Sequence, residues 1–342
     1  MNQENPNAVP GKPLRYDNLD GVRAYAAIGI LLMHVLGNGG YALGGFVFGK
    51  LIPSFTDLVF LFMAVSCFSM CCGYYEKVIS GSLDLGKFYT KRFVKVWPFF
   101  AVMCLADFAM SPGMDTLYQL LADLTLCFGL IPNADITVIG VGWFLGLVFV
   151  FYFMFPFICS MLSSKRRAWI SFFVGLLLSG LCVLYFGAKR NSFAYSGVFF
   201  LAGGMLYLYR EPLRRFVDRL YWLAALLAAG SLVAYYWAGS ILPTQLAAAV
   251  LLLLLAMGKK NVIMSNPVTK KLGSISMEIY LCHMMVYRVL EKLKLHHIFG
   301  PSLLSYVVTA VVTLVGAVAL SMIVNQLLAA MGGLFSKKNR TN

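Results

Sequence analysis

Apolar segments of about twenty residues, separated by short polar loops, recur along the whole chain. A helix needs roughly 20 mostly apolar residues to cross about 30 Å of hydrocarbon, and a backbone exposed to lipid must satisfy its own hydrogen bonds. The 342 residues are 60% hydrophobic and 12% charged, which is unlike a water-soluble domain. The sequence therefore predicts an all-α, polytopic integral membrane protein with no separate soluble domain.

About ten transmembrane helices are expected from apolar windows of roughly 19 residues. The predicted spans lie near 21–41, 53–73, 96–111, 142–163, 168–187, 193–209, 220–238, 243–258, 273–292 and 302–332. One extra apolar segment near 117–131 is expected to be re-entrant or interfacial. If this segment does not cross the membrane, five basic clusters lie on the same side of the membrane. The positive-inside rule assigns that side to the cytoplasm. The clusters are Lys87/Lys91/Arg92/Lys95, Lys165/Arg166/Arg167, Arg210/Arg214/Arg215/Arg219, Lys259/Lys260/Lys270/Lys271 and Lys337/Lys338/Arg340.

This topology places a multi-pass protein in the cell membrane with both termini in the cytoplasm. Residues 1–20 form a polar tail that has neither the apolar core nor the cleavage site of a signal peptide. Residues 21–334 form one transmembrane domain, and residues 335–342 form a basic cytoplasmic tail. Lys189/Arg190 and Lys292/Lys294 are the basic residues left on the outer side.

The formal net charge of +14 comes from clusters scattered between spans. This pattern predicts contact with the headgroups of membrane lipids and argues against nucleic acid, since no recognition motif accompanies the charge. The eight cysteines lie inside apolar segments without a CxxC pattern, so neither a disulfide framework nor a metal site is expected.

Ionisable residues at membrane depth are costly and mark sites of function. The first span carries Arg23 and, eleven residues later, His34. Eleven helical steps return to within about 20° of the start and rise about 16 Å, so both side chains are expected on one side of the helix. His283 in the ninth span is expected at a similar depth, roughly 15 Å from the cytoplasmic end of that span.

A neutral imidazole can accept a proton from a hydroxyl near neutral pH, and basic side chains at the inner mouth would bind a phosphate-rich donor. Arg23, Arg92 and Lys95 supply such groups. The stretch FYTKRFVKVWPFF around the last two is expected to be a basic interfacial turn that ends at Pro98, where the third span begins. Less specific interpretations stay open: a structural histidine bonded to Ser or Tyr, basic residues that only set topology, and Arg23 as a snorkelling anchor.

Several segments occur in an order that resembles the membrane-bound acyltransferase-3 family. They are LDGVR with its histidine further along the first span, KRFVKVWPFF, GWFLGLVFVFYFMFP, FFLAGGMLYL and SISMEIYLCH. The resemblance covers nearly the whole chain. It implies a ten-helix domain that O-acylates cell-surface carbohydrates.

The resemblance assigns roles residue by residue. It makes His34 the expected catalytic base, with His283 as a second catalytic group and Arg23 as the partner of His34 on the first helix. Arg92 and Lys95 become the basic pair that holds the donor. The expected supporting residues are Asp20, Trp143, Tyr152, Ser276 and Tyr280.

The sequence also departs from the family pattern at four positions. Val148 and Phe149 stand where the family often has glutamates, Phe60 replaces an aspartate, and Cys67 replaces a glycine. These departures indicate a divergent branch. Because no extracytoplasmic esterase-like domain is fused to the segment, the domain is expected to complete the transfer alone or to hand its acyl group to a partner protein.

The resemblance implies an O-acyltransferase that moves an acyl group, most simply acetyl, from acyl-CoA to a hydroxyl of an exported glycan or its lipid-linked precursor. Acyl-CoA would be a substrate, with no permanently bound cofactor. Two other functions remain open on the sequence. One is a transporter or flippase for a glycan precursor or small solute, with the histidines relaying protons; the other is a sensing or scaffold domain that has lost catalysis.

Overall fold

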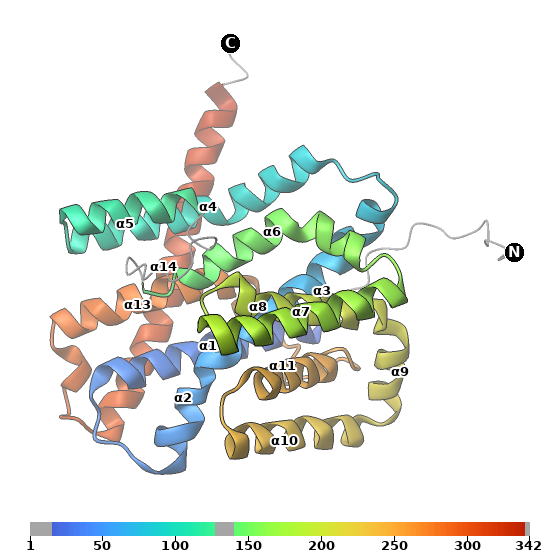
Figure 1. Ribbon diagram of the computed structural model, residues 1–342. Helices are drawn as coiled ribbons and strands as arrows, with labels where there is room; N and C mark the ends of the chain where they lie inside the picture. Colours follow the sequence, from blue (N-terminus) through green and yellow to red (C-terminus); the bar gives the residue numbers. More distant parts are fainter. Residues whose placement is uncertain (1–15, 127–139, 339–342) are drawn as a thin grey trace, which may run out of the picture.

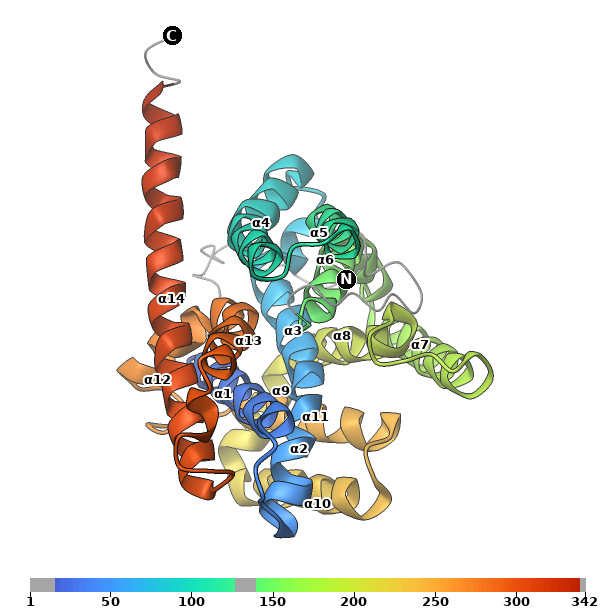
Figure 2. The ribbon, with the colours of Figure 1, turned by 90° about the vertical axis from the view of Figure 1, so that its left-hand side faces the viewer.

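Helix α1 (Asn18–Gly39) packs most extensively against helices that come from both ends of the chain, α3, α12, α13 and α14 (Figures 1 and 2). The computed structural model describes residues 16–126 and 140–338. Gly40 ends α1 in the left-handed conformation (φ 60°), which a residue without Cβ adopts at no steric cost. The central position of α1 brings any group on it close to several other helices.

The remaining helical elements follow in chain order. They are η1 (Val47–Leu51), α2 (Ile52–Ser54), η2 (Phe55–Asp57), α3 (Leu58–Ile79), α4 (Leu85–Met110), α5 (Met114–Thr125), α6 (Trp143–Met161), α7 (Lys165–Phe186), α8 (Phe193–Leu208), α9 (Arg210–Arg219), α10 (Tyr221–Ala238), α11 (Leu242–Ala256), α12 (Pro267–Ser274), α13 (Ser276–Lys292), η4 (Leu295–His297) and α14 (Leu303–Lys338).

The all-α, polytopic membrane fold is confirmed. Within the described ranges, seven helical segments are long and apolar enough to cross a membrane, and α8 and α11 are shorter apolar helices. The seven are Asn18–Gly39, Val47–Ile79, Leu85–Met110, Trp143–Met161, Lys165–Phe186, Tyr221–Ala238 and Leu303–Ala330. α13, the predicted ninth span, has 17 residues and carries four charged side chains, so length and composition alone do not mark it.

Helix α5 occupies most of the segment expected to be re-entrant or interfacial, of which residues 127–131 lie outside the described chain. Its 12 residues rise about 18 Å, which is too short to cross about 30 Å of hydrocarbon. α5 lies beside α4 (Figure 1), and the indole Nε1 of Trp97 donates to the carbonyl of Leu124 at 2.9 Å.

The predicted interfacial turn before Pro98 is wrong, because α4 is one continuous helix from Leu85 to Met110 with Pro98 inside it. The helix starts early because the Asp84 carboxylate accepts a hydrogen bond from the backbone N–H of Lys87 at 3.0 Å, which caps the first turn. This bond also lowers the pKa of Asp84. Apolar spans tolerate proline where neighbouring groups satisfy the freed carbonyl, so Pro98 is not a boundary.

Glycines allow the closest contacts between helices. A Cβ on Gly203 of α8 would lie 2.1 Å from the carbonyl oxygen of Ala64 of α3, and a Cβ on Gly273 of α12 would lie 2.1 Å from that of Asp20 of α1. Small residues serve this purpose in membrane bundles. Gly203 and Gly273 therefore act as packing positions that let neighbouring helices approach closely.

The expected domain boundaries fall near helix ends. Residues 1–15 of the predicted N-terminal tail lie outside the described chain, and α1 begins at Asn18, inside that tail. α14 continues past residue 334 to Lys338 and stands clear of the other helices at its C-terminal end (Figures 1 and 2).

Candidate active site

His34 of α1 and His283 of α13 lie side by side, with ring centroids 5.2 Å apart and planes tilted by 44°. The helices start at the same face of the bundle, which we call the N-terminal face, and α1 packs directly on α13. Two histidines predicted to share a depth from separate spans are therefore neighbours. His296 and His297 lie in a separate group in the loop after α13, where His297 Nε2 is 2.5 Å from the carbonyl oxygen of Gly39.

The orientation of the His283 ring follows from its hydrogen bonding. Its Nδ1 lies 2.7 Å from the carbonyl oxygen of Tyr280. A carbonyl only accepts, so Nδ1 carries the proton and Nε2 is left with a lone pair. Nε2 is buried and has no other partner among the described residues. The His283 side chain thus presents an acceptor next to the ring of His34.

A cavity of about 200 Å³ lies beside His34. Its polar wall combines His34 of α1, Tyr280 of α13, Trp143 at the start of α6, Thr56 before α3 and Arg190 from the loop between α7 and α8. Ile30, Met33 and Val59 form the apolar part of the cavity lining. The Tyr280 hydroxyl donates to the carbonyl of Val141 at 2.9 Å, which holds that side chain in place.

Arg190 was not predicted as a site residue. Its guanidinium donates to the hydroxyl of Thr56 at 2.9 Å and to the carbonyl of Thr56 at 2.6 Å, and it pairs with Asp57 at 3.3 Å. It also lies over the rings of Trp143 and Phe60, at 5.2 Å and 5.4 Å from the centroids. Arg190 therefore closes the cavity on the side opposite the N-terminal face.

Asp57 connects Arg190 to the ends of α10 and α11. Its Oδ2 accepts hydrogen bonds from Tyr235 at 2.6 Å, from Gln245 at 3.1 Å and from Ser240. The sequence suggested no role for this aspartate. The one sequence signal for this pair was that Arg190 is a basic residue in an outer loop, where the positive-inside rule expects few basic residues.

Arg23 lies near the N-terminal face on the side of α1 that carries His34, about 16 Å lower by helix geometry. It donates to the hydroxyl of Ser69 at 2.6 Å and pairs with the carboxylate of Asp20 at 3.3 Å. Asp20 therefore orients Arg23 and does not reach the cavity beside His34.

Arg92 and Lys95 lie one turn apart on α4. The Arg92 guanidinium lies over three aromatic rings, with Cζ 4.9 Å from the centroid of Tyr74 and 5.8 Å from those of Phe88 and Tyr152. Its Nε is buried without a hydrogen-bond partner. Lys95 is exposed and interacts electrostatically with Arg92, Glu278 and Arg23, so the three predicted donor-binding residues gather in one region.

The other predicted supporting residues lie in three places. Trp143 and Tyr280 line the cavity, and Tyr152 lies beside Arg92. Ser276 lies apart from these groups, because its hydroxyl donates to the carbonyl of Gly273 at 3.0 Å within the turn between α12 and α13.

The four departures from the family pattern fill space. Val148 is fully buried, and Phe149 packs edge-on against Tyr152 at 5.7 Å. Phe60 stacks on Phe199 at 4.2 Å beneath Arg190, and the buried Cys67 faces Gly204. Apolar packing thus occupies the three positions where the resemblance implied acidic groups, Phe60, Val148 and Phe149.

With this geometry in hand, comparison with models of protein families matches residues 16–323 to a family described as "Acyltransferase domain". The chain belongs to the membrane-bound acyltransferase-3 family. The match covers nearly all of the described residues and confirms the resemblance seen in the ordered segments. No curated protein and no solved structure matches the chain. Family and fold together make the protein a multi-pass membrane acyltransferase.

Proposed function

We propose that this acyltransferase moves an acetyl group from acetyl-CoA, bound at a cytoplasmic N-terminal face, to a hydroxyl of an exported glycan or its lipid-linked precursor. The observation that carries the proposal is the pair His34 and His283, 5.2 Å apart, of which His34 faces a cavity with polar walls. Such a cavity suits a hydroxyl acceptor. Charged side chains stand on both sides of it along the membrane normal.

His34 acts as general base. The distance between the two ring centroids leaves room for an N–H of His34 to donate to Nε2 of His283, which carries no proton. This hydrogen bond would direct the other ring nitrogen of His34 into the cavity. His34, His283 and the Tyr280 carbonyl then form a series of hydrogen-bonded groups. The arrangement is similar to other acyl-transfer sites, in which a third group orients the base. In this arrangement His283 positions His34.

The transfer needs no oxidant or further co-reactant. The acceptor oxygen attacks the thioester carbonyl carbon while His34 takes the hydroxyl proton, so a C–O bond forms and an O–H bond breaks. Collapse of the tetrahedral intermediate breaks the C–S bond, and the proton passes from His34 to the departing thiolate. The products are the acetyl ester and free coenzyme A.

Arg23, Arg92 and Lys95 bind the phosphates of the donor. Arg92 suits this role because its guanidinium is held by aromatic rings and its Nε lacks a partner. Charge-assisted hydrogen bonds to phosphate are among the strongest polar contacts. Membrane lipids surround the domain, and a partner protein would be needed only if the acyl group left the active site on a carrier.

The test is acetyl transfer in vesicles that hold the purified protein, with radiolabelled acetyl-CoA outside and glycan fractions on either side. Replacement of His34 by Ala should lower the transfer rate by about 10²–10⁴-fold, the contribution of a general base. His296→Gln in the separate loop group is the matched control and should keep the rate. A folded His34→Ala protein with full activity would disprove the assignment, and movement of unmodified glycan without label transfer would indicate a flippase.

A further inference from the structure

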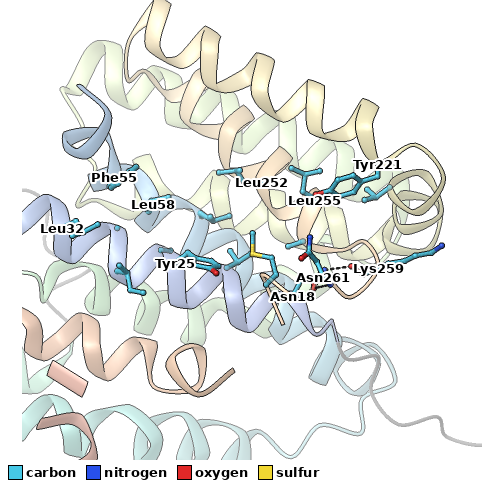
Figure 3. Close-up of a pocket in the computed structure, with 18 of the residues that line it drawn as sticks. Asn18, Tyr25, Leu32, Phe55, Leu58, Tyr221, Leu252, Leu255, Lys259 and Asn261 are labelled. Carbon is cyan, nitrogen blue, oxygen red and sulfur yellow. Dashed lines mark hydrogen bonds between the residues drawn. The ribbon is translucent and has the colours of Figure 1, made fainter. Parts of the chain in front are cut away.

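A large cavity lies away from the histidines. It measures about 560 Å³ and runs between α1, α3, α11 and the junction of α9 and α10 (Figure 3). Its walls are almost entirely apolar, with Leu32, Phe55, Leu58, Leu252 and Leu255 labelled in the close-up. We call this cavity the α1 groove.

The α1 groove lies on the opposite side of α1 from the proposed active site. Two steps along a helix turn it by about 200°, so Tyr25 points away from Arg23, and Leu32 points away from His34. Tyr25 and Leu32 line the groove, and His34 lines the other cavity. The groove is therefore not the place where the acyl group is transferred.

The length of the groove matches one lipid chain in one leaflet. Its lining on α1 extends from Asn18 to Leu32, fifteen residues whose fourteen helical steps rise about 21 Å. Half of the hydrocarbon of a bilayer is about 15 Å thick. The groove thus extends from mid-membrane to the headgroup region of the leaflet at the N-terminal face.

The mouth of the groove has a fixed backbone. The side-chain amide of Asn18 donates to the carbonyls of Gly258 and Lys259 at 3.2 and 3.0 Å, and its oxygen accepts from the backbone N–H of Asn261 at 3.0 Å (Figure 3). Tyr25 donates to the carbonyl of Ile263 at 2.9 Å. These bonds hold the loop between α11 and α12 in one position.

Two charged side chains at this mouth are incompletely paired. Lys259 is exposed and forms no ion pair within the described residues. Asp218 Oδ2 lies 3.7 Å from Nε of Arg214, but its buried Oδ1 has no hydrogen-bond partner. The mouth therefore offers one ammonium group without an ion-pair partner in the described chain together with one unsatisfied acceptor, and burying an acceptor without a donor is costly.

We infer that the α1 groove binds one anionic phospholipid whose headgroup carries a hydroxyl beyond its phosphate, as in phosphatidylglycerol. One acyl chain lies along the apolar wall, the phosphate contacts Lys259, and a glycerol hydroxyl donates to Oδ1 of Asp218. Basic pockets between helices bind anionic lipid headgroups in this way. The bound chain packs behind α1, on the side away from Arg23 and His34.

The test measures lipid retention on the purified full chain by native mass spectrometry, after exchange from mixed micelles of three probes. Phosphatidylglycerol should be retained most, phosphatidylmethanol, which lacks the hydroxyl, less, and phosphatidylcholine least. Lys259→Glu should lower retention of phosphatidylglycerol by at least about five-fold, the effect of roughly 1 kcal/mol per cation near a headgroup. Lys260→Glu is the matched control, because Lys260 is also exposed but does not line the groove.

Two further variants separate the parts of the inference. Ala256→Phe should fill the groove and abolish retention of all three probes, with folding checked by size exclusion in detergent. Asp218→Ala should remove the preference for phosphatidylglycerol over phosphatidylmethanol. Equal retention of the three probes, or equal effects of Lys259→Glu and Lys260→Glu, would overturn the inference, and neither result involves acyl transfer.

Discussion

Two arginines near opposite ends of the proposed substrate path are held in different ways. Arg92, near the N-terminal face, lies among aromatic rings and has no carboxylate within ion-pair distance in the described chain. Arg190, on the other side of His34, uses its terminal nitrogens on Thr56 and Asp57. Nε is unpaired in both side chains, so the contrast lies in the terminal nitrogens, which Arg190 commits to a hydroxyl, a carbonyl and a carboxylate.

This difference indicates two roles for the same side chain. Aromatic rings hold a guanidinium in place without consuming its N–H donors, which leaves them for a phosphate. A carboxylate and a carbonyl consume those donors, so Arg190 joins the start of α3 to the loop between α7 and α8 and shapes the cavity wall. We therefore expect Arg92 to matter most for donor binding and Arg190 most for stability.

Among the replacements that test this contrast between the two arginines, Arg92→Ala should have the largest effect. Loss of a charge-assisted hydrogen bond costs about 2 kcal/mol, so the KM for acetyl-CoA should rise about 30-fold while the melting temperature changes little. Initial rates across donor concentrations measure this. Lys87→Ala on the same helix is the control, because Lys87 is exposed and, among the described residues, its one ion pair is with Asp84 at 3.1 Å; the KM of this variant should change less than about two-fold.

Arg190→Ala should act on stability. Removing it leaves the buried Asp57 carboxylate without its cation, although Tyr235, Ser240 and Gln245 still donate to it. Arg190 is a third exposed, which reduces the loss to about 1.5 kcal/mol of unfolding free energy. Unfolding in detergent measures this, with exposed Lys189→Ala as the control. A 30-fold rise in donor KM with unchanged stability would reverse the roles of the two arginines.

A double replacement sharpens the same point. Asp57→Asn together with Arg190→Met removes both charges and keeps most of the volume. Because no buried charge is left unpaired, the double variant should be more stable than Arg190→Ala by about 1 kcal/mol. If it is less stable than either single variant, then the ion pair itself, and not the avoidance of an unpaired carboxylate, stabilises this end of the bundle.

The sequence predicted that His34 and His283 share a depth, because helix geometry alone carries that argument, and the structure adds that their rings are neighbours. The depth of His34 and that of His283 each follow from counting residues from the start of an apolar span, and groups at one depth in a small bundle meet easily. The family pattern then identified Trp143 and Tyr280, which share the cavity with His34. The all-helical membrane fold followed from apolar segments in the same direct way.

Contacts that join distant loops could not be predicted in this manner. Five helices, α3 to α7, separate Asp57 from Arg190 along the chain, and the sequence rule for loop charges sorts them by membrane side without pairing them. The prediction at Pro98 was wrong for a related reason. In a water-soluble protein a proline usually ends or kinks a helix, whereas α4 continues through Pro98. In both cases tertiary surroundings, which the local sequence does not contain, decide the outcome.

The smallest effect is expected from the rings around Arg92. Tyr74→Leu removes the nearest aromatic face, 4.9 Å from the guanidinium, and should raise the donor KM about three-fold, since an aromatic contact to a cation is worth roughly 0.5–1 kcal/mol at a partly exposed site. Tyr74→Phe keeps the ring and should leave KM unchanged. If Phe is as damaging as Leu, the hydroxyl and not the ring positions Arg92, and the contrast with the carboxylate-bound Arg190 loses its physical basis.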